Sequence, residues 1–307
     1  MKILYAAGNR IGSHYLLKRF LSSIKDQNHT IQIAAYKKSL GNLNADYTLD
    51  CLLNFTDPEG SISFNDNYSY YFKQIEKFKP NLIISDMELY TSLLAIENNI
   101  PIWQVSSALL YYALPNKVKH SLEINKNYGY FINNDHKKKE YINFILNNSD
   151  RKFVVSHLCD LPSAPKLKKS YEYIRPDFIL PEDKKHSYAH LAILSEYNQK
   201  VIDILKDKKS VCMIDNINYD EKIYSDLLNN CDTFINDGNS SFLSDAFYNQ
   251  KYCLMYPNYN DIESIINCYI NQYYNLGSMD ISSAPQKIEI NIDNNIKFIA
   301  EEIKRFK

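Results

Sequence analysis

Several features that assign a chain to a familiar class are missing here. The 307 residues contain six cysteines but no C-x-x-C pair, so zinc ribbons and disulfide frameworks are disfavoured and buried thiols are expected. The formal net charge is -1, which gives no global field toward nucleic acid or anionic lipid. No G-x-G-x-x-G sequence is present, because the first loop offers only Gly8 and Gly12. There is no Asp-x-Asp pair either, and we expect no essential metal.

Long apolar runs are also missing. No run approaches the roughly 20 residues that span a bilayer, so we expect no stable membrane insertion. Met1 leads directly into the strand-like sequence KILYAA, which leaves no room for a signal peptide. The sequence therefore predicts a cytoplasmic protein, with peripheral attachment to a membrane as the association left open.

Short apolar runs alternate with longer amphipathic segments along the chain, which is typical of βαβ units and parallel sheets. Ile3–Ala7 predicts the first strand. Ser13–Lys25 predicts the first helix, because its apolar residues recur every three or four positions. Leu82–Ser85 predicts a buried strand, and we expect Phe153–Ser156 to be the last strand of the first half.

Residues 157–187 interrupt this rhythm. They contain four prolines and no clear amphipathic period, which indicates a crossover between domains. The rhythm restarts with a strand near Ala189–Leu194 and ends with a helix over about Asn294–Phe306. We therefore expect an α/β protein with two Rossmann-like doubly wound domains, 1–165 and 166–307, that face a cleft, and a final helix that packs back on the first domain.

The most informative stretch is 234–257, which reads FINDGNSSFLSDAFYNQKYCLMYP. It predicts a strand, a turn at Gly238 and a helix that opens with Asn239, Ser240 and Ser241. A helix start presents free N–H groups and the positive end of the helix dipole, so it can hold a diphosphate without a metal. Asn239 or Ser240 would equally serve as an N-cap.

This stretch, with its Gly turn, its Ser-Asp-Ala sequence and its proline-bearing second strand, resembles the donor-binding segment of GT-B glycosyltransferases, in the MurG-like and UDP-glucuronosyltransferase-like branch. The resemblance implies that Gly238–Ser241 hold the diphosphate of a nucleotide sugar, with a UDP-sugar as the expected donor. It implies that Asp245 holds the ribose; otherwise Asp245 is a helix-surface acid. It also implies that Asp261 and Glu263 contact the sugar; otherwise they are acids favoured by a helix dipole.

Two motifs in the first half extend the resemblance. Gly8–Arg19, GNRIGSHYLLKR, resembles the family's first loop, in which His14 would accept the proton of an attacking hydroxyl; otherwise His14 is a cap or surface residue. Asn81–Glu88, NLIISDME, resembles a step in MurG-like glycosyltransferases. Asp86 would lie at the carboxyl end of a strand and orient His14 or act as the base itself. Its alternative role is the N-cap of the helix at Leu89.

The sequence departs from the family pattern in three places. Asp237 stands where a second glycine is usual, and it brings negative charge near the expected diphosphate. Ser264 replaces the glutamine of the sugar-contact pair. The loop after Leu194 lacks a phosphate grip rich in glycine, serine or threonine. The first two departures favour a non-catalytic nucleotide-sugar-binding partner subunit as an alternative.

The resemblance implies a glycosyltransferase that moves a sugar from a nucleotide diphosphate to an acceptor hydroxyl, with inversion and without a metal. A nucleotide-sugar epimerase or hydrolase of the same fold is an alternative, and it would need a second acid or base. The acceptor is left open between a lipid-linked sugar, a small molecule, a protein and a modified DNA base. The apolar stretch Leu109–Leu114, with Lys117, Lys119 and His120 after it, is either an interfacial patch for a lipid-linked acceptor or a buried helix with a solvated end.

Overall fold

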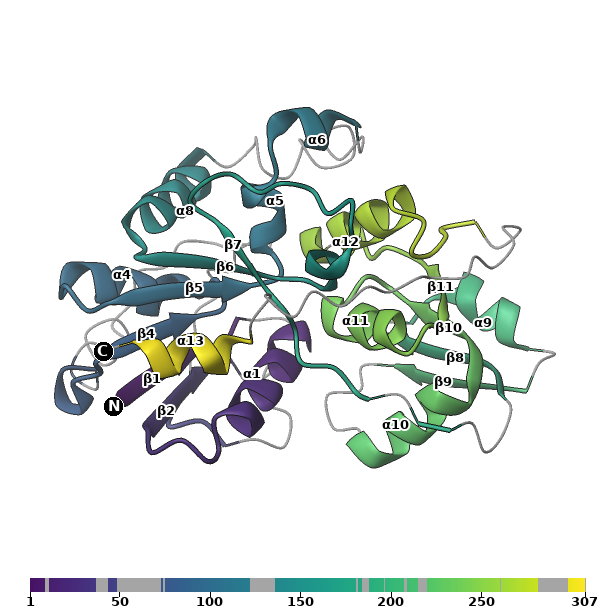
Figure 1. The fold of residues 1–307 in the computed structure, drawn as a ribbon, viewed down its shortest axis with the longest axis horizontal. Coiled ribbons are helices and arrows are strands. Elements are labelled where there is room, and N and C mark those ends of the chain that lie inside the picture. The colour runs from purple at the N-terminus through teal and green to yellow at the C-terminus, as the bar shows by residue number, and fades with distance from the viewer. Residues whose placement is uncertain are drawn as a thin grey trace. The chain divides into compact units, whose positions relative to one another are not determined.

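The computed structural model describes residues 1–8, 11–36, 44–48, 73, 75–121, 136–180, 182–183, 188–195, 197–206, 209–214, 220–259, 261–280 and 298–306. The chain forms two compact units, each with a parallel sheet and helices (Figure 1). Unit 1 comprises Met1–Val155, Pro165–Ile174 and Lys297–Lys307. Unit 2 comprises Ser156–Ala164 and Arg175–Ile296.

Unit 1 is built on a seven-stranded sheet in the order β3-β2-β1-β4-β5-β6-β7, and all of its strand pairs are parallel. The chain moves outward from β1 to β3 and restarts at β4 on the other side of β1, as in doubly wound α/β folds. The strands are β1 (Lys2–Ala6), β2 (Thr30–Ala35), β3 (Tyr47–Thr48), β4 (Leu82–Ser85), β5 (Ile102–Ser106), β6 (Arg151–Val155) and β7 (Glu172–Ile174). The described helices are α1 (Ile11–Ser23), α4 (Leu89–Glu97), α5 (Leu109–Ala113), α6 (Asn116–Ser121), α8 (His136–Asn148) and α13 (Ile299–Arg305).

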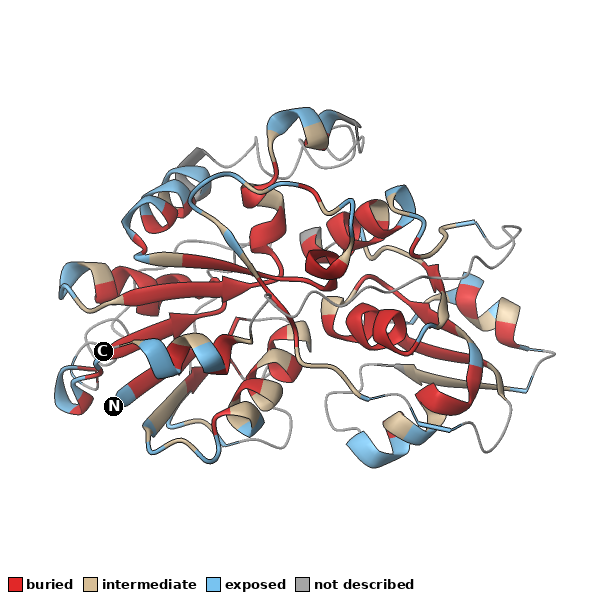
Figure 2. Cartoon of the chain, viewed as in Figure 1, coloured by how far each residue is buried: buried red, intermediate tan, exposed pale blue. Residues whose placement is uncertain are grey.

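The core of unit 1 uses both faces of this sheet, whose central strands are buried (Figure 2). Tyr5 of β1 packs on Phe20 of α1, with ring centroids 4.7 Å apart. Leu4 belongs to the cluster on the other face, because successive side chains of a strand alternate. Ile303 of α13 lies in the same buried cluster as Tyr5. The prediction that the final helix packs on the first domain is therefore confirmed.

Unit 2 is built on a four-stranded parallel sheet in the order β11-β10-β8-β9. Its strands are β8 (Tyr188–Leu194), β9 (Ser210–Ile214), β10 (Cys231–Asn236) and β11 (Tyr252–Met255). The described helices are the short 3₁₀ helix η1 (His157–Asp160) and the α-helices α9 (Gln199–Leu205), α10 (Glu221–Asn230), α11 (Ser240–Tyr248) and α12 (Ile262–Tyr273). Both units therefore have the doubly wound α/β organisation that the alternating pattern predicted.

The segment expected to be an irregular crossover contributes to both units. Glu172–Ile174 pairs with β6, so the prediction that 153–156 is the last strand of the first half is wrong. Residues 156–164 belong to unit 2, and 165–174 belong to unit 1, which differs from the expected single boundary at 165/166. The physical reason is pairing: prolines mark where regular structure is interrupted, but long-range partners decide which unit holds each piece.

A buried ion pair joins the two pieces of the crossover that belong to unit 2. The Arg175 guanidinium donates from Nε to Asp160 Oδ2 at 2.9 Å and from Nη2 to Oδ1 at 2.5 Å. The Tyr248 hydroxyl donates to the same carboxylate at 2.5 Å. Asp160 is 2 % exposed and Arg175 is 7 % exposed, so the charges neutralise each other away from water.

None of the described helices is long and apolar enough to cross a membrane.

Candidate functional site

Unit 2 has a topological switch point at the carboxyl edge of its sheet. From β8 the chain goes to β9 at one edge of the sheet and then returns to β10 on the other side of β8. The loops after β8 and β10 therefore leave in opposite directions, and open α/β sheets bind ligands at such points. β8 ends at Leu194 and β10 ends at Asn236, so Asp237 is the first residue beyond its strand.

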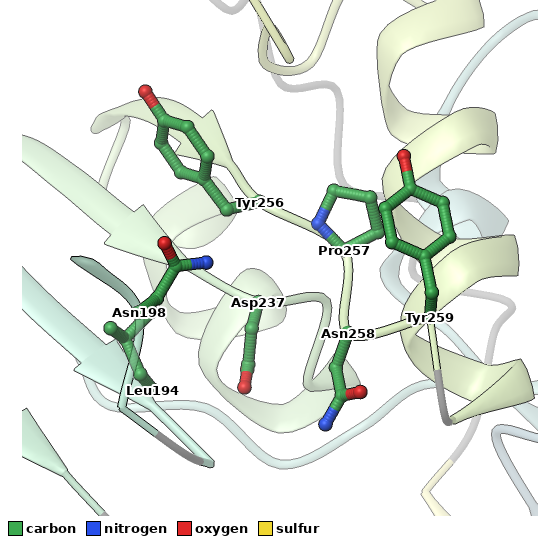
Figure 3. A pocket seen from close by; sticks show the side chains of 7 residues that line it. All are labelled: Leu194, Asn198, Asp237, Tyr256, Pro257, Asn258 and Tyr259. Atoms are coloured by element: carbon green, nitrogen blue, oxygen red, sulfur yellow. The ribbon is translucent and has the colours of Figure 1, made fainter. Parts of the chain in front are cut away.

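A cavity of about 260 Å³ opens at this edge (Figure 3). Its lining comes from the residues that follow β8, β10 and β11, together with the last residue of β8: Leu194, Asn198, Asp237, Tyr256, Pro257, Asn258 and Tyr259. Figure 3 shows the rings of Tyr256 and Tyr259 to either side of Pro257, and the side chains of Asp237 and Asn258 directed the same way. Two phenol rings beside amide and carboxyl groups suit a ligand with a flat apolar part and several hydrogen-bonding groups.

Asp237 holds the end of β8 in place. Its Oδ2 accepts hydrogen bonds from the Ser195 backbone N–H, at 2.6 Å, and from the Ser195 hydroxyl. Asn258 Nδ2 donates to the same hydroxyl at 3.4 Å. Two donors at the end of β8 are thus already occupied by a carboxylate of the chain.

Burial is the main cause of an unusually high pKa at Asp237. The residue is 6 % exposed, and desolvation raises the pKa of its carboxyl from 3.8 to about 6. The negative charge of Asp261 adds to the rise, whereas the hydrogen bonds from Ser195 oppose it. The carboxyl is therefore poised to gain or lose a proton near neutral pH.

Gly238 forms the turn that the sequence predicted. Its φ is +95°, and a Cβ there would lie 2.4 Å from the Ser264 carbonyl oxygen, so only glycine fits. Its N–H donates to Asn236 Oδ1 at 2.8 Å, and its carbonyl accepts from Asn267 Nδ2 at 2.9 Å. The turn is therefore rigid, held against both β10 and α12.

The residues after the turn start α11 as expected. Asn239 is the N-cap, and its Oδ1 accepts from the Ser241 N–H at 3.1 Å. Asn239 and Ser240 are partly exposed, whereas Ser241 is 7 % exposed. The capping role weighed for Asn239 is confirmed. Residues 238–241 are not among those that line the cavity, and their contact with a diphosphate stays a prediction.

Asp245 lies deeper in α11 and is fully buried. Its Oδ1 accepts from the Ile179 N–H at 2.9 Å, and its Oδ2 accepts from the Tyr224 hydroxyl at 3.0 Å. Asp245 is not among the residues that line the cavity. This geometry favours a structural role that ties the 175–180 segment and α10 to α11, and the ribose contact stays a prediction.

The acids after β11 lie at the start of α12. Asp261 is the N-cap, with Oδ1 accepting from the Glu263 N–H at 2.9 Å, and Glu263 is 4 % exposed in the first turn. Ser264, which stands in place of the family's glutamine, donates from its hydroxyl to the Asp237 carbonyl and accepts from the Asn258 N–H. Ser264 therefore joins the loops after β10 and β11 into one wall.

In unit 1, the residues expected to act on the acceptor also lie at a switch point. β1 and β4 are neighbours, with Ala6 opposite Ser85, and the Asp86 N–H donates to the Ala6 carbonyl at 2.8 Å. A Cβ at Gly8 would lie 3.3 Å from Asp86 Oδ2, so the loop after β1 passes close to this carboxylate. His14, in the first turns of α1, is 2 % exposed, and Asp86 is 1 % exposed. The expected surface alternative for His14 is therefore wrong.

Glu88 caps the helix for which Asp86 was the alternative N-cap. Its Oε1 accepts from the Tyr90 N–H at 3.0 Å and its Oε2 from the Thr91 N–H at 2.7 Å. Burial raises the pKa of Glu88, while hydrogen bonds from Thr91, Tyr90 and Tyr36 oppose the rise. Capping is therefore assigned to Glu88, and Asp86 is left for another role.

Most of the residues that line the cavity were not predicted from the sequence. Residues 256–259, after β11, form much of its lining, and the resemblance extends to Tyr256 and Pro257 without assigning them a contact. The signal that could have found them is position alone, because residues 256–259 lie at and after the end of the second strand predicted in the stretch 234–257. Among the described residues, no three His, Cys, Asp or Glu side chains come together as a metal site.

No family model matches the sequence, and no curated protein matches it. Solved structures with a similar fold include the glycosyltransferase SsfS6 of Streptomyces sp. SF2575 in complex with thymidine diphosphate (TM-score 0.55, 15% identity, 90% of this chain and 87% of that chain). The glycosyltransferase of kitacinnamycin gives a TM-score of 0.58 at 12% identity, over 92% of this chain and 87% of that chain. The UDP-GlcNAc 2-epimerase of Methanocaldococcus jannaschii gives 0.51 at 12% identity, over 99% of both chains. At such identities the likeness shows the fold, which is the two-domain GT-B fold.

Proposed function

We propose that this chain is a glycosyltransferase that moves a sugar from a nucleotide diphosphate sugar, with a UDP-sugar as the expected donor, to an acceptor hydroxyl. The proposed transfer inverts the anomeric carbon and needs no metal. The observation that carries the proposal is the cavity at the switch point of unit 2. The fold shared with glycosyltransferases supports it, one of them solved with thymidine diphosphate.

The proposed donor lies at the carboxyl edge of the unit 2 sheet. Gly238–Ser241 receive the diphosphate, because a helix start offers N–H groups and a positive dipole end. The rings of Tyr256 and Tyr259 supply flat apolar surface for the base. Asp261 and Glu263 receive hydroxyls of the sugar, and the effect of the Asp261 charge on Asp237 supports a place for Asp261 near the cavity.

The proposed reaction is a direct displacement at the anomeric carbon. An acceptor hydroxyl attacks, the bond to the diphosphate breaks, and the nucleotide diphosphate leaves with both bonding electrons. His14 takes the proton of the attacking hydroxyl, and Asp86 orients the imidazole or replaces it as the base. Their shared place at the β1/β4 switch point of unit 1 supports this pairing.

Two alternatives have an observation of their own. The likeness to a UDP-GlcNAc 2-epimerase over almost the whole of both chains favours an epimerase or hydrolase of the same fold. Asp237 accepts a hydrogen bond from Ser195 and brings negative charge to the cavity. Both features favour a non-catalytic nucleotide-sugar-binding subunit.

One series of measurements separates these possibilities. UDP-, TDP- and GDP-sugars are titrated into the protein by calorimetry, and the tightest binder is incubated with and without candidate acceptors. Nucleotide release that depends on an acceptor supports transfer, release without one supports hydrolysis, and a changed sugar configuration by NMR supports epimerisation. Binding without any conversion supports the partner-subunit alternative. A chelator arm checks the metal, since activity abolished by EDTA and restored by magnesium would contradict metal-independent transfer.

A further inference from the structure

One buried histidine of unit 2, His157, does not line the cavity. It is the first residue of the short helix η1 and is 2 % exposed. Burial is the main cause that lowers the pKa of His157 to about 4, whereas a hydrogen bond with Asn271 and the charge of Asp160 oppose the shift. The imidazole is therefore neutral at neutral pH, and it contributes through directed hydrogen bonds rather than through charge.

Both ring nitrogens of His157 meet a polar side chain. Nε2 lies 2.8 Å from Asn271 Oδ1, and Nδ1 lies 3.1 Å from Ser244 Oγ. The orientation of the Asn271 amide is fixed, because its Nδ2 donates to the Asn267 carbonyl at 2.7 Å. Asn271 Oδ1 therefore faces the imidazole, so Nε2 carries the proton and Nδ1 is left as an acceptor.

One chain of hydrogen bonds runs from the imidazole through α12 to the turn at Gly238. His157 donates to Asn271, and Asn271 donates to the Asn267 carbonyl. Asn267 in turn donates from Nδ2 to the Gly238 carbonyl at 2.9 Å. Asn267 and Asn271 are both buried and lie four residues apart, on the same face of the helix. A buried amide is unfavourable unless its polar atoms are satisfied, so this chain fixes the side of α12 against which the turn rests.

A second path runs from the imidazole through α11. The Ser244 hydroxyl, which lies beside His157 Nδ1, donates to the Ser240 carbonyl at 2.7 Å. Ser240 is the first residue of α11, so this bond closes the first turn of the helix. His157 therefore reaches the turn by two routes, at Gly238 through α12 and at Ser240 through α11.

We propose that His157 is a positioning residue for the turn at 238–241, where it fixes the direction of the backbone N–H groups without touching their ligand. A hydrogen bond weakens steeply as its angle departs from linear, so a small rotation of these groups reduces what they can bind. That the ligand is the diphosphate of a nucleotide sugar rests on the proposed function. The effect of His157 on the turn itself does not.

Three variants separate the hydrogen bonds of His157 from the packing of its ring. His157→Phe keeps an aromatic ring beside Phe247, whose ring centroid lies 4.9 Å from that of the imidazole, and removes both hydrogen bonds. His157→Gln restores an N–H donor toward Asn271. Ser156→Ala is the matched control, because it removes the N-cap of the same short helix, where the hydroxyl accepts from the Leu158 N–H.

Two measurements on the full-length protein test the proposal. Amide hydrogen exchange at 238–241, without nucleotide, should be about fivefold faster in His157→Phe and should change less than about twofold in Ser156→Ala. In calorimetry, His157→Phe should bind UDP about fivefold more weakly, whereas its affinity for uridine, which lacks the phosphates, should change less than about twofold. His157→Gln should recover part of both effects. A purely structural role would lower the free energy of unfolding without a selective effect on 238–241 or on UDP.

Exchange at 238–241 that is equally fast in the unchanged protein and in His157→Phe would overturn the proposal. So would a UDP affinity that is unchanged, or that falls by the same factor as the affinity for uridine. If His157→Phe does not fold, Ser244→Ala decides, because it breaks the path through α11 and leaves the imidazole in place; faster exchange at 238–241 is then expected. If no nucleotide binds the unchanged protein, the proposed function fails, and hydrogen exchange still decides the role of His157.

Discussion

Replacing Asp237 by asparagine should change how stability depends on pH. In the folded protein burial raises the pKa of this carboxyl to about 6, against 3.8 without that burial. Folding therefore favours the protonated form, and stability is lost as pH rises from about 4 to about 6 and is constant above. At 1.36 kcal/mol per pH unit, the penalty at pH 7 is roughly 3 kcal/mol at most. Asp237→Asn has no proton to lose, and its amide oxygen still accepts from Ser195.

The assay is urea unfolding of both proteins at several pH values between 4 and 8, with the difference between them plotted against pH. Other titrating groups cancel in this difference, provided that they do not couple to Asp237. We expect the free energy of unfolding of the variant to rise relative to that of the unchanged protein up to about pH 6. Above that pH the difference between the two should stay constant. Asp203→Asn is the control for which a flat difference is expected, because hydrogen bonds from Lys206 and Gln199 lower the pKa of that exposed acid and its pH-dependent contribution falls below this range. A difference that is flat across this range would refute the reasoning about Asp237.

The same carboxyl should affect donor binding, if the proposed function holds. An ionised Asp237 beside a diphosphate repels it, so affinity for a UDP-sugar should fall by up to about tenfold per pH unit above pH 6. A sugar ester of the diphosphate is the right probe, because its phosphates do not titrate in this range. Asp237→Asn should bind with little dependence on pH. Identical pH profiles for the two proteins would mean that Asp237 does not face the diphosphate.

Other expectations follow from buried groups. Asp245→Ala leaves the buried Tyr224 hydroxyl and the part-buried Ile179 N–H without an acceptor, so it should lose about 2–4 kcal/mol in urea unfolding. Unchanged nucleotide affinity would rule out its ribose contact. His14→Ala should lower turnover by about 10²–10⁴-fold with donor affinity nearly intact. Asp86→Asn combined with His14→Ala should lower turnover little further. A less stable His14→Ala protein with normal turnover would contradict the base role. Asp160→Asn strands the Arg175 guanidinium, and a loss of about 3–5 kcal/mol is expected in the same unfolding assay, whereas an unchanged midpoint would show that the pair contributes nothing.

Much of the fold could be predicted from local pattern. The alternation of strands and helices, the two-unit organisation and the final helix follow from which faces are apolar, and Ile303 lies in the core as its spacing requires. The turn at Gly238 was also predictable, since a glycine between a strand and a capping residue indicates a positive φ. The apolar periodicity of each element and the glycine turn depend only on residues close together in the chain, so the sequence is sufficient to predict them.

The tertiary structure alone decided which distant partners these elements meet. Asp245 has the pattern of a helix-surface acid, yet it is buried because Ile179 and Tyr224, 66 and 21 positions away, supply its two donors. Glu172–Ile174 joins unit 1 because β6 offers a free edge, not because of its own composition. The pKa of Asp237 depends on burial by three loops that no spacing rule brings together. Periodicity determines that a face is buried, whereas charge state and site geometry depend on what buries it.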